Sequence, residues 1–262
     1  MYIYPDEAKL SSPLIFDSHA HIDDIAFDGI LDTLIPDIAS NGVAGIVCCG
    51  CNEASSKKTL EIAEKYDIVY GAVGIHPEDV NKSSDTDFIL NLISNKKCVA
   101  IGEIGLDLYW EKENKELQIE VFKKQLEIAK EFDLPVLIHD REAHADTLEL
   151  LKKYRPKGVL HCYSGSVEMA EEILKLGMYI GVGGVITFKN AKKLPDVVRM
   201  LPEDRILLET DCPYLSPEPL RGKLCHSGLI TFTAQKVAEI KGADTQTVLG
   251  TTLKNAKNLF NL

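Results

Sequence analysis

Six residues that can bind a metal ion lie at or just after the ends of short apolar runs in this 262-residue chain. His19 and His21 follow the first run and are two positions apart, so on a strand their side chains point to the same side. Four more follow later runs: Glu103, His139, His161 and Asp211. A mixture of imidazole and carboxylate groups suits Zn²⁺, Mn²⁺ or a related divalent ion better than Ca²⁺, which prefers oxygen ligands alone. These residue types therefore predict a metal site.

The number of ligands bears on the number of ions. Six exceed the three or four that one catalytic zinc ion takes, and they suffice for two ions if a carboxylate such as Glu103 bridges them. Two ions about 3.5–4 Å apart can activate a water molecule and stabilise a leaving oxygen, with Asp211 placed to accept the proton. Any one histidine could instead be hydrogen-bonded in the core, but four of the chain's seven occur at such positions. That concentration favours a common site.

The elements that must position these residues alternate along the whole chain. Apolar runs rich in β-branched residues predict eight strands, at residues 14–19, 45–49, 68–74, 98–104, 135–139, 158–161, 178–182 and 206–210. Stretches of helical period predict helices at 30–41, 53–66, 85–95, 115–132, 142–153, 166–176, 192–201, 227–240 and 245–261. This pattern predicts an α/β fold, a (β/α)₈ TIM barrel that forms one domain over residues 1–262, with an open doubly wound sheet as the alternative. Barrel active sites lie at the carboxyl ends of the strands.

Composition narrows the class of protein. Hydrophobic residues make up 45 %, which excludes a disordered chain. The formal net charge of −11 argues against a broad basic face for nucleic acid, but not against a phosphate held through bound metal. No apolar run is long enough to cross a membrane and the first residues do not resemble a signal peptide, so we expect a cytoplasmic protein without membrane contact. Nothing indicates an obligate protein partner, and the seven cysteines are expected to be free thiols.

Six motifs together resemble one known family. They are DSHAH (17–21), GIHP (74–77), GEIGLD (102–107), PVLIHDR (135–141), HCYSG (161–165) and LETDCP (208–213). The chain resembles the TatD-type metal-dependent deoxyribonucleases of the amidohydrolase-like barrel superfamily, over nearly its whole length. The resemblance implies metal-dependent hydrolysis of DNA phosphodiesters, often from a 3′ end, in a TatD-like hydrolase barrel.

The resemblance also implies roles for the six ligands. His19 and His21 would bind one divalent ion (Zn, Mg or Mn), and His139 and His161 would bind a second. Glu103 would bridge the two ions. Asp211 would be both a ligand and the general base.

Four residues are candidates for substrate binding. By the same resemblance, His76 is a phosphate contact, with a loop-capping histidine as the alternative. Arg141 could bind a phosphate through two hydrogen bonds or hold a neighbouring acid. Arg221 and Lys223 match the family's basic loop after the last strand and could bind phosphate, with a solvated loop as the alternative; LCHS (224–227) departs from the family's usual sequence there.

Other residues are expected to support the site or to pack. Asp17 and Glu209 could orient the ligands that lie two positions later. Tyr109 and Trp110 could stack a nucleobase or pack in a loop. Strand alternation predicts that Cys162 and Cys212 pack away from the site, and Cys48, Cys49 and Cys51 are interpreted as core thiols.

Three functions remain open on this basis. The first is a nuclease for DNA ends or single strands, which the acidic charge predicts to bind DNA weakly and without sequence preference. The second is a hydrolase of a small amide, lactone or phosphoester, because the same two ions could activate water for either. The third is a non-catalytic barrel that binds a partner, and the complete ligand set argues against it.

Overall fold

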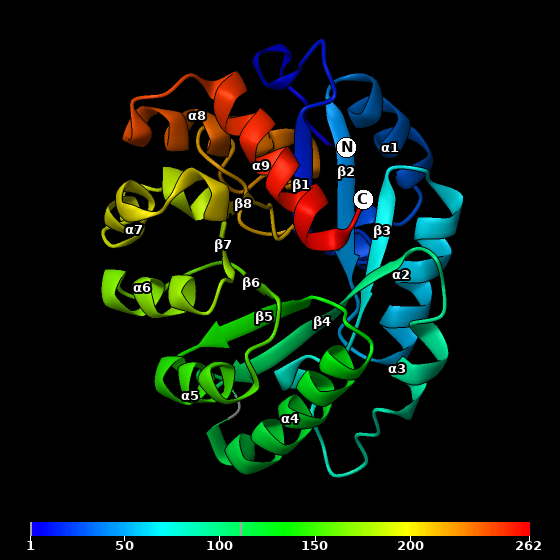
Figure 1. Ribbon diagram of the computed structural model, residues 1–262. Coiled ribbons are helices and arrows are strands. Elements are labelled where there is room, and N and C mark those ends of the chain that lie inside the picture. Colours follow the sequence, from blue (N-terminus) through cyan, green and yellow to red (C-terminus); the bar gives the residue numbers. More distant parts are fainter. Residues whose placement is uncertain (1, 111) are drawn as a thin grey trace.

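Eight parallel strands form a ring in a computed structural model that describes residues 2–110 and 112–262 (Figure 1). Each strand pairs with the next along the chain, in the order β1 to β8. Their bounds are β1 Ile15–Ala20, β2 Val43–Cys49, β3 Val69–Val73, β4 Cys98–Asp107, β5 Val136–Arg141, β6 Gly158–Leu160, β7 Tyr179–Val182 and β8 Ile206–Leu208. The prediction of a single-domain TIM barrel is confirmed.

Helices surround the ring and connect the strands (Figure 1). They are α1 Leu31–Ser40, α2 Glu53–Lys65, α3 Asp87–Leu92, α4 Lys115–Glu131, α5 His144–Tyr154, α6 Val167–Lys175, α7 Leu194–Met200, α8 Ile230–Lys241 and α9 Thr245–Phe260. Local signals set several of their ends. The Ser166 side chain caps α6 by accepting a hydrogen bond from the Met169 N–H, and Asn52 with Ser55 forms a capping box on α2. None of these helices is long and apolar enough to cross a membrane within the described ranges.

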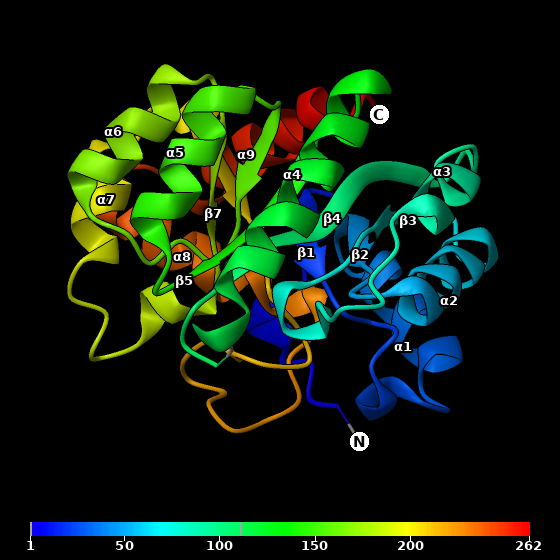
Figure 2. The same ribbon diagram turned by 90° about the horizontal axis from the view of Figure 1, so that it is seen from below.

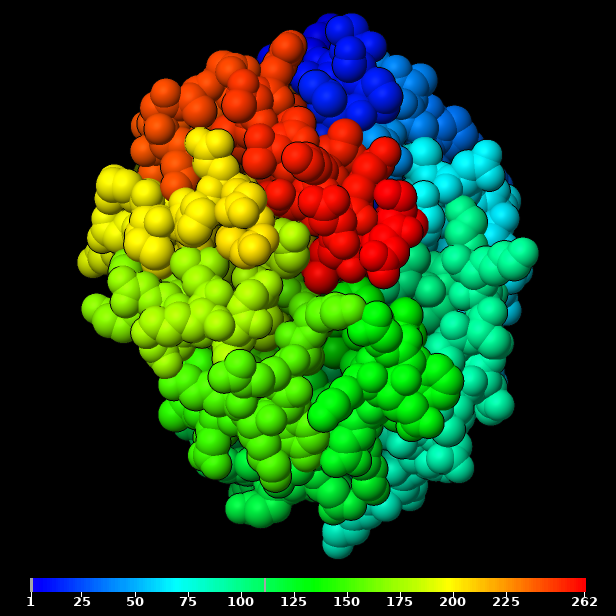
Figure 3. Space-filling view, viewed as in Figure 1, coloured from blue at the N-terminus to red at the C-terminus, as the bar shows by residue number. Residues whose placement is uncertain are grey.

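The barrel interior is closed at one end by α9. Side chains that point inward from the strands, such as Phe16 and Leu137, pack in one cluster with Ala256, Leu259 and Phe260 of that helix. The red helix α9 covers the middle of this face in Figure 3. Figure 2 shows the long orange segment that follows β8 on the opposite side of the molecule from α9. The functional groups therefore have to lie at the other, carboxyl end of the barrel.

The seam between β1 and β8 is closed near that carboxyl end. The Ser18 hydroxyl donates to the Leu208 carbonyl (3.0 Å), and the Asp211 N–H donates to the His19 carbonyl (3.0 Å). The His21 N–H donates to the Cys212 carbonyl (2.8 Å). These bonds fix the first and last candidate ligand segments against each other.

The ends of the strands differ from those predicted. β4 and β5 continue to Asp107 and Arg141, whereas β6 and β8 end at Leu160 and Leu208. His161 and Asp211 therefore lie in the turns that follow short strands. Cys162 and Asp211 have left-handed backbones, with φ of 44° and 58°, and such a turn breaks the alternation of side chains that a longer strand would impose.

Candidate metal centre

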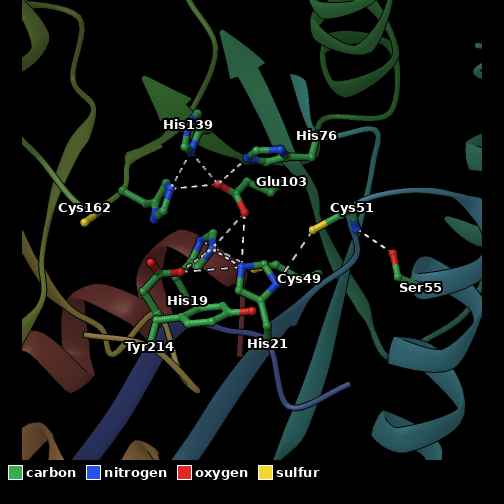
Figure 4. Close-up of polar contacts among 12 residues, drawn as sticks. His19, His21, Cys49, Cys51, Ser55, His76, Glu103, His139, Cys162 and Tyr214 are labelled. Carbon is green, nitrogen blue, oxygen red and sulfur yellow. Dashed lines mark hydrogen bonds and ion pairs between the residues drawn. The ribbon is translucent and has the colours of Figure 1, made fainter. Parts of the chain in front are cut away.

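The six predicted ligands converge at the carboxyl end of the barrel. Figure 4 shows the imidazoles of His19, His21, His76 and His139 turned toward the Glu103 carboxylate. Sets of potential ligand atoms lie within 4.8 Å of one another, among them the sets His19–His21–Asp211 and His19–Glu103–His161. Residues far apart in the sequence thus form one dense group of nitrogen and oxygen donors.

Glu103 divides this group in two. Its Oε2 atom lies 3.2 Å from Nε2 of both His19 and His21. Its Oε1 atom lies 2.9 Å from His139 Nδ1 and 2.8 Å from His161 Nε2. Each carboxylate oxygen therefore has its own pair of imidazoles within 3.2 Å, an arrangement suited to a carboxylate shared between two ions.

Asp211 belongs to the first half of the group. Its Oδ1 atom lies 3.5 Å from His21 Nε2 and 3.8 Å from His19 Nε2. The two imidazole nitrogens are themselves 3.2 Å apart. One position is thus surrounded by four donor atoms, the two imidazole nitrogens, Asp211 Oδ1 and Glu103 Oε2. A divalent ion can be bound by four protein donors.

The imidazoles of His21 and His139 each have an acceptor on the side that faces away from Glu103. This acceptor determines which ring nitrogen carries the proton and which has a free lone pair. His21 Nδ1 lies 3.0 Å from the Cys49 carbonyl, which can only accept, so Nδ1 carries the proton and Nε2 is free in the neutral ring. His139 Nε2 lies 3.1 Å from Asp107 Oδ2, so Nδ1 is the free nitrogen in that ring. A carbonyl or carboxylate behind the ring is the usual support of a metal-binding histidine.

The charges of the group fit a site for cations. Burial alone would raise the pKa of Glu103, but His161, His76 and His19 outweigh it and hold that pKa well below its ordinary value. Burial opposes the protonation of His139, but Asp107 and Glu103 raise its pKa to about 10. The positive charge of protonated imidazoles therefore balances the buried carboxylates Glu103 and Asp107. Bound metal ions would take the place of these protons. The donor set and its supports fit divalent metal ions.

A glycine lets the two strands beneath the centre approach. Gly105 of β4 has a φ of 146°, and a Cβ atom there would lie 2.0 Å from the His139 carbonyl oxygen. Only glycine adopts this backbone beside a neighbouring strand without strain. The Gly-Leu-Asp part of the 102–107 motif therefore places Glu103 and Asp107 on either side of His139.

Comparisons with known proteins agree with this geometry. The family model described as TatD related DNase matches residues 16–261. The chain belongs to the TatD family. The metal-dependent hydrolase YabD of Bacillus subtilis is 39 % identical over 254 residues, covering 95 % of this chain and 100 % of YabD.

Solved structures of TatD-family proteins have the same fold. The crystal structure of YjjV, a TatD homologue from Escherichia coli, superposes with a TM-score of 0.90 at 32 % identity, covering 95 % of this chain and 99 % of that one. A TatD-family hydrolase from Entamoeba histolytica gives a TM-score of 0.83 at 25 % identity, with 94 % and 97 % covered. This TatD-family protein is therefore a metal-dependent hydrolase.

The candidate substrate residues fall into two groups. His76 and Arg141 line a cavity of about 1210 Å³ that also holds the metal centre. The His76 Nδ1 atom accepts a hydrogen bond from the Glu78 N–H, so its Nε2 carries the proton and faces Glu103 Oε1 at 3.4 Å. Arg221 and Lys223 are not among the residues that line this cavity, and the Arg221 guanidinium lies over the Phe188 ring at 3.6 Å.

Two supporting carboxylates have different partners from those expected. Asp17 accepts hydrogen bonds from the backbone N–H groups of His19 (3.3 Å) and Thr210 (3.0 Å), and so it ties β1 to the segment after β8. Glu209 accepts from the Cys162 N–H, and its Oε1 atom lies 3.9 Å from His161 Nδ1. Burial raises the pKa of Glu209 to about 8. Glu209 therefore lies beside His161 rather than Asp211 and holds the backbone of the turn that follows His161.

Two cysteines lie at the cavity instead of in packing. Cys162 and Cys51 both line it, and Cys51 Sγ is 3.8 Å from His21 Nδ1. The prediction that Cys162 packs away from the site is wrong, because β6 ends before His161 and alternation does not extend to the turn. Cys51 is likewise only partly buried, whereas Cys48, Cys49 and Cys212 are buried as predicted.

Three functional candidates were missed from the sequence. Asp107 was only the end of a motif, yet its carboxylate holds His139. Lys192 and Lys193 line the cavity from the loop between β7 and α7. Their signal was available, because residues 189–193 contain three lysines in an otherwise acidic chain.

Proposed function

We propose that this protein is a deoxyribonuclease that hydrolyses DNA phosphodiester bonds, in the manner of a 3′ exonuclease, with two divalent ions (Zn, Mg or Mn). The proposal rests mainly on the position of the Glu103 carboxylate. Its two oxygens lie 2.8–3.2 Å from separate pairs of imidazoles. A shared carboxylate between two ligand sets is what a two-ion hydrolytic centre requires. The described relatives are metal-dependent hydrolases, and the family model's description names DNase.

The ligands of each ion would be the residues that face one oxygen of Glu103. His19, His21 and Asp211 would hold one ion, His139 and His161 the other, and Glu103 both. When bound, such ions lower the pKa of a water molecule and neutralise charge on a phosphate. The second half contains fewer protein donors, which leaves room for substrate or water there.

Asp211 is the proposed general base. Its side chain is partly exposed to the cavity, whereas Glu103 is buried beneath the imidazoles. Burial alone would raise the pKa of Asp211, but its hydrogen bond to His21 and the nearby His161 and His19 lower it. The carboxylate is therefore ionised at neutral pH, as a group that accepts a proton from water must be.

Hydrogen-bond donors at the cavity would hold the phosphate. His76 presents Nε2–H, because its Nδ1 already accepts from the Glu78 N–H. The Arg141 guanidinium lies 4.2 Å from the centre of the Tyr109 ring, and no ion pair joins it to a carboxylate in the described ranges. Its N–H groups are thus available to an anion, and Lys192 and Lys193 add positive charge to the lining of the same cavity.

The size of the cavity favours a chain-like substrate. Its volume of about 1210 Å³ exceeds the range of about 300–1,000 Å³ that is usual for small-molecule sites. A hydrolase of a small amide, lactone or phosphoester, the second candidate, would leave much of this space and its basic wall unused. The charge of −11 still predicts weak DNA binding without sequence preference.

The test is cleavage of end-labelled single-stranded DNA by the purified protein supplied with Mg²⁺, Mn²⁺ or Zn²⁺. We expect shortened products from the wild type and none from Glu103→Ala or Asp211→Ala. A matched control is Glu78→Ala, which removes an exposed carboxylate of the same cavity outside the two ligand halves. Cleavage that is absent in the wild type, or equal in Glu103→Ala, would refute a nuclease with this centre.

A further inference from the structure

Two large aromatic side chains lie exposed at the edge of the cavity that includes the candidate metal ligands. Trp110 is 61 % exposed and lines the cavity, and its neighbour Tyr109 is 52 % exposed. The two rings meet edge to face, with centroids 4.6 Å apart. Exposed aromatic surface is costly in water and, when grouped at a cavity, indicates a binding surface.

A basic group supports the pair from the neighbouring strand. The Arg141 guanidinium lies 4.2 Å from the Tyr109 ring centre and 5.5 Å from that of Trp110. The Leu108 N–H also donates to the Arg141 carbonyl at 2.9 Å. These contacts hold the aromatic rings in place although more than half of each residue is exposed to solvent.

The loop that carries the rings is attached to the metal centre itself. Asp107 Oδ1 accepts hydrogen bonds from the N–H groups of both Tyr109 and Trp110, each at 2.9 Å. Its other oxygen, Oδ2, holds Nε2 of the ligand His139 at 3.1 Å. One buried carboxylate therefore fixes the aromatic pair relative to the place where a phosphate would react.

We propose that Trp110, supported by Tyr109 and Arg141, stacks an unpaired nucleobase next to the phosphodiester at the metal centre. The proposal rests on the proposed nuclease function and adds a requirement for a free base. A flat, exposed ring is sequence-tolerant because every base has a π face, and the guanidinium beside it suits the neighbouring phosphate. A base paired within a duplex presents no such face, so the site selects single-stranded ends.

The test compares Trp110→Ala with wild type on two single-stranded oligonucleotides. One is unmodified, and the other lacks bases at the terminal nucleotides of both ends. Base–aromatic stacking corresponds to a loss of about 5- to 150-fold in kcat/KM when the ring is removed. We expect this loss on the unmodified strand, little change on the abasic strand, and recovery with Trp110→Phe.

The matched control is Phe132→Ala, which removes another exposed aromatic ring (47 %) from the end of α4, away from the cavity. This variant should cleave both strands like the wild type. Equal loss on both strands in Trp110→Ala, or no loss on either, would overturn the stacking proposal while leaving the nuclease intact.

A binding measurement separates failure of stacking from failure of the nuclease. Trp110 is the chain's single tryptophan, so its fluorescence reports on this position alone. In the metal-loaded Asp211→Asn variant, the unmodified oligonucleotide should quench it and the abasic one should not. Selective quenching together with no cleavage by the wild type would support stacking and refute the nuclease, whereas no quenching by either strand would overturn the stacking proposal.

Discussion

Replacing Asp107 by Asn should weaken the metal centre without removing a ligand. Asp107 is fully buried, and its Oδ1 atom accepts from the N–H groups of Tyr109 and Trp110. In the variant, the amide oxygen has to stay with these two donors, which turns the amide NH₂ toward His139 Nε2. Two donors would then face each other across the 3.1 Å that the hydrogen bond now spans.

In the neutral ring, which is the form that binds a metal ion, the conflict is relieved when the proton moves to the other nitrogen. His139 Nε2 would accept from the amide, and the proton would sit on Nδ1, the atom 2.9 Å from Glu103 Oε1. Nδ1 would then have no lone pair for an ion. Loss of such a support typically costs 10- to 100-fold in metal affinity or activity, which equals about 1.4–2.8 kcal/mol.

The assay is metal affinity by competition with a chelator, together with the ¹⁵N shifts of the His139 ring. Asp140→Asn is the matched control, because Asp140 Oδ2 holds His144 Nδ1 at 2.7 Å in a similar pair that touches neither ligand half. We expect the control to bind metal like the wild type. An unchanged metal affinity in Asp107→Asn, with the ring proton still on Nε2, would refute the reasoning about the proton's position.

Three further changes have defined outcomes. Burial lowers the pKa of His226, so below about pH 6.5 the unfolded chain binds a proton that the folded chain does not. The free energy of unfolding therefore falls as the pH drops. His226→Gln should reduce this fall, as measured by urea unfolding between about pH 6.5 and 5. Gly105→Ala should lower the free energy of unfolding by at least about 2 kcal/mol, because the new Cβ atom meets the His139 carbonyl; an unchanged urea midpoint would contradict this. Replacing Lys192 and Lys193 by Gln should weaken DNA binding and lower the salt slope of log K by about 2, with metal content unchanged.

The sequence was sufficient for the barrel and for which residues converge. The alternation of apolar runs and helical stretches is visible in the sequence, and each motif lies at or just after the carboxyl end of a strand, at one rim of the barrel. His19 and Asp211 come together because β1 and β8 are the strands that close the ring. The resemblance and the periodicity thus agree on the positions of all six donors.

The sequence was not sufficient for the supports around those donors. Glu209 accepts from the Cys162 N–H because the chain turns left-handed at Cys162, and a backbone angle at one non-glycine residue has no clear sequence signal. Asp107 lies four residues after Glu103, and only the length of β4 brings it against His139. Such contacts depend on where strands end, which is the least certain part of any assignment from sequence.

Bound metal should control DNA binding, because of the charges that line the cavity. Among its described lining residues are eight carboxylates and three basic side chains. A phosphodiester therefore meets net negative charge unless divalent ions are present, and ions in the two halves of the site would offset most of it. We expect the affinity for single-stranded DNA, measured with Asp211→Asn at physiological salt, to rise at least tenfold when a divalent ion is added. Equal affinity with and without the ion would show instead that the basic wall of Lys192 and Lys193 binds DNA independently of the metal centre.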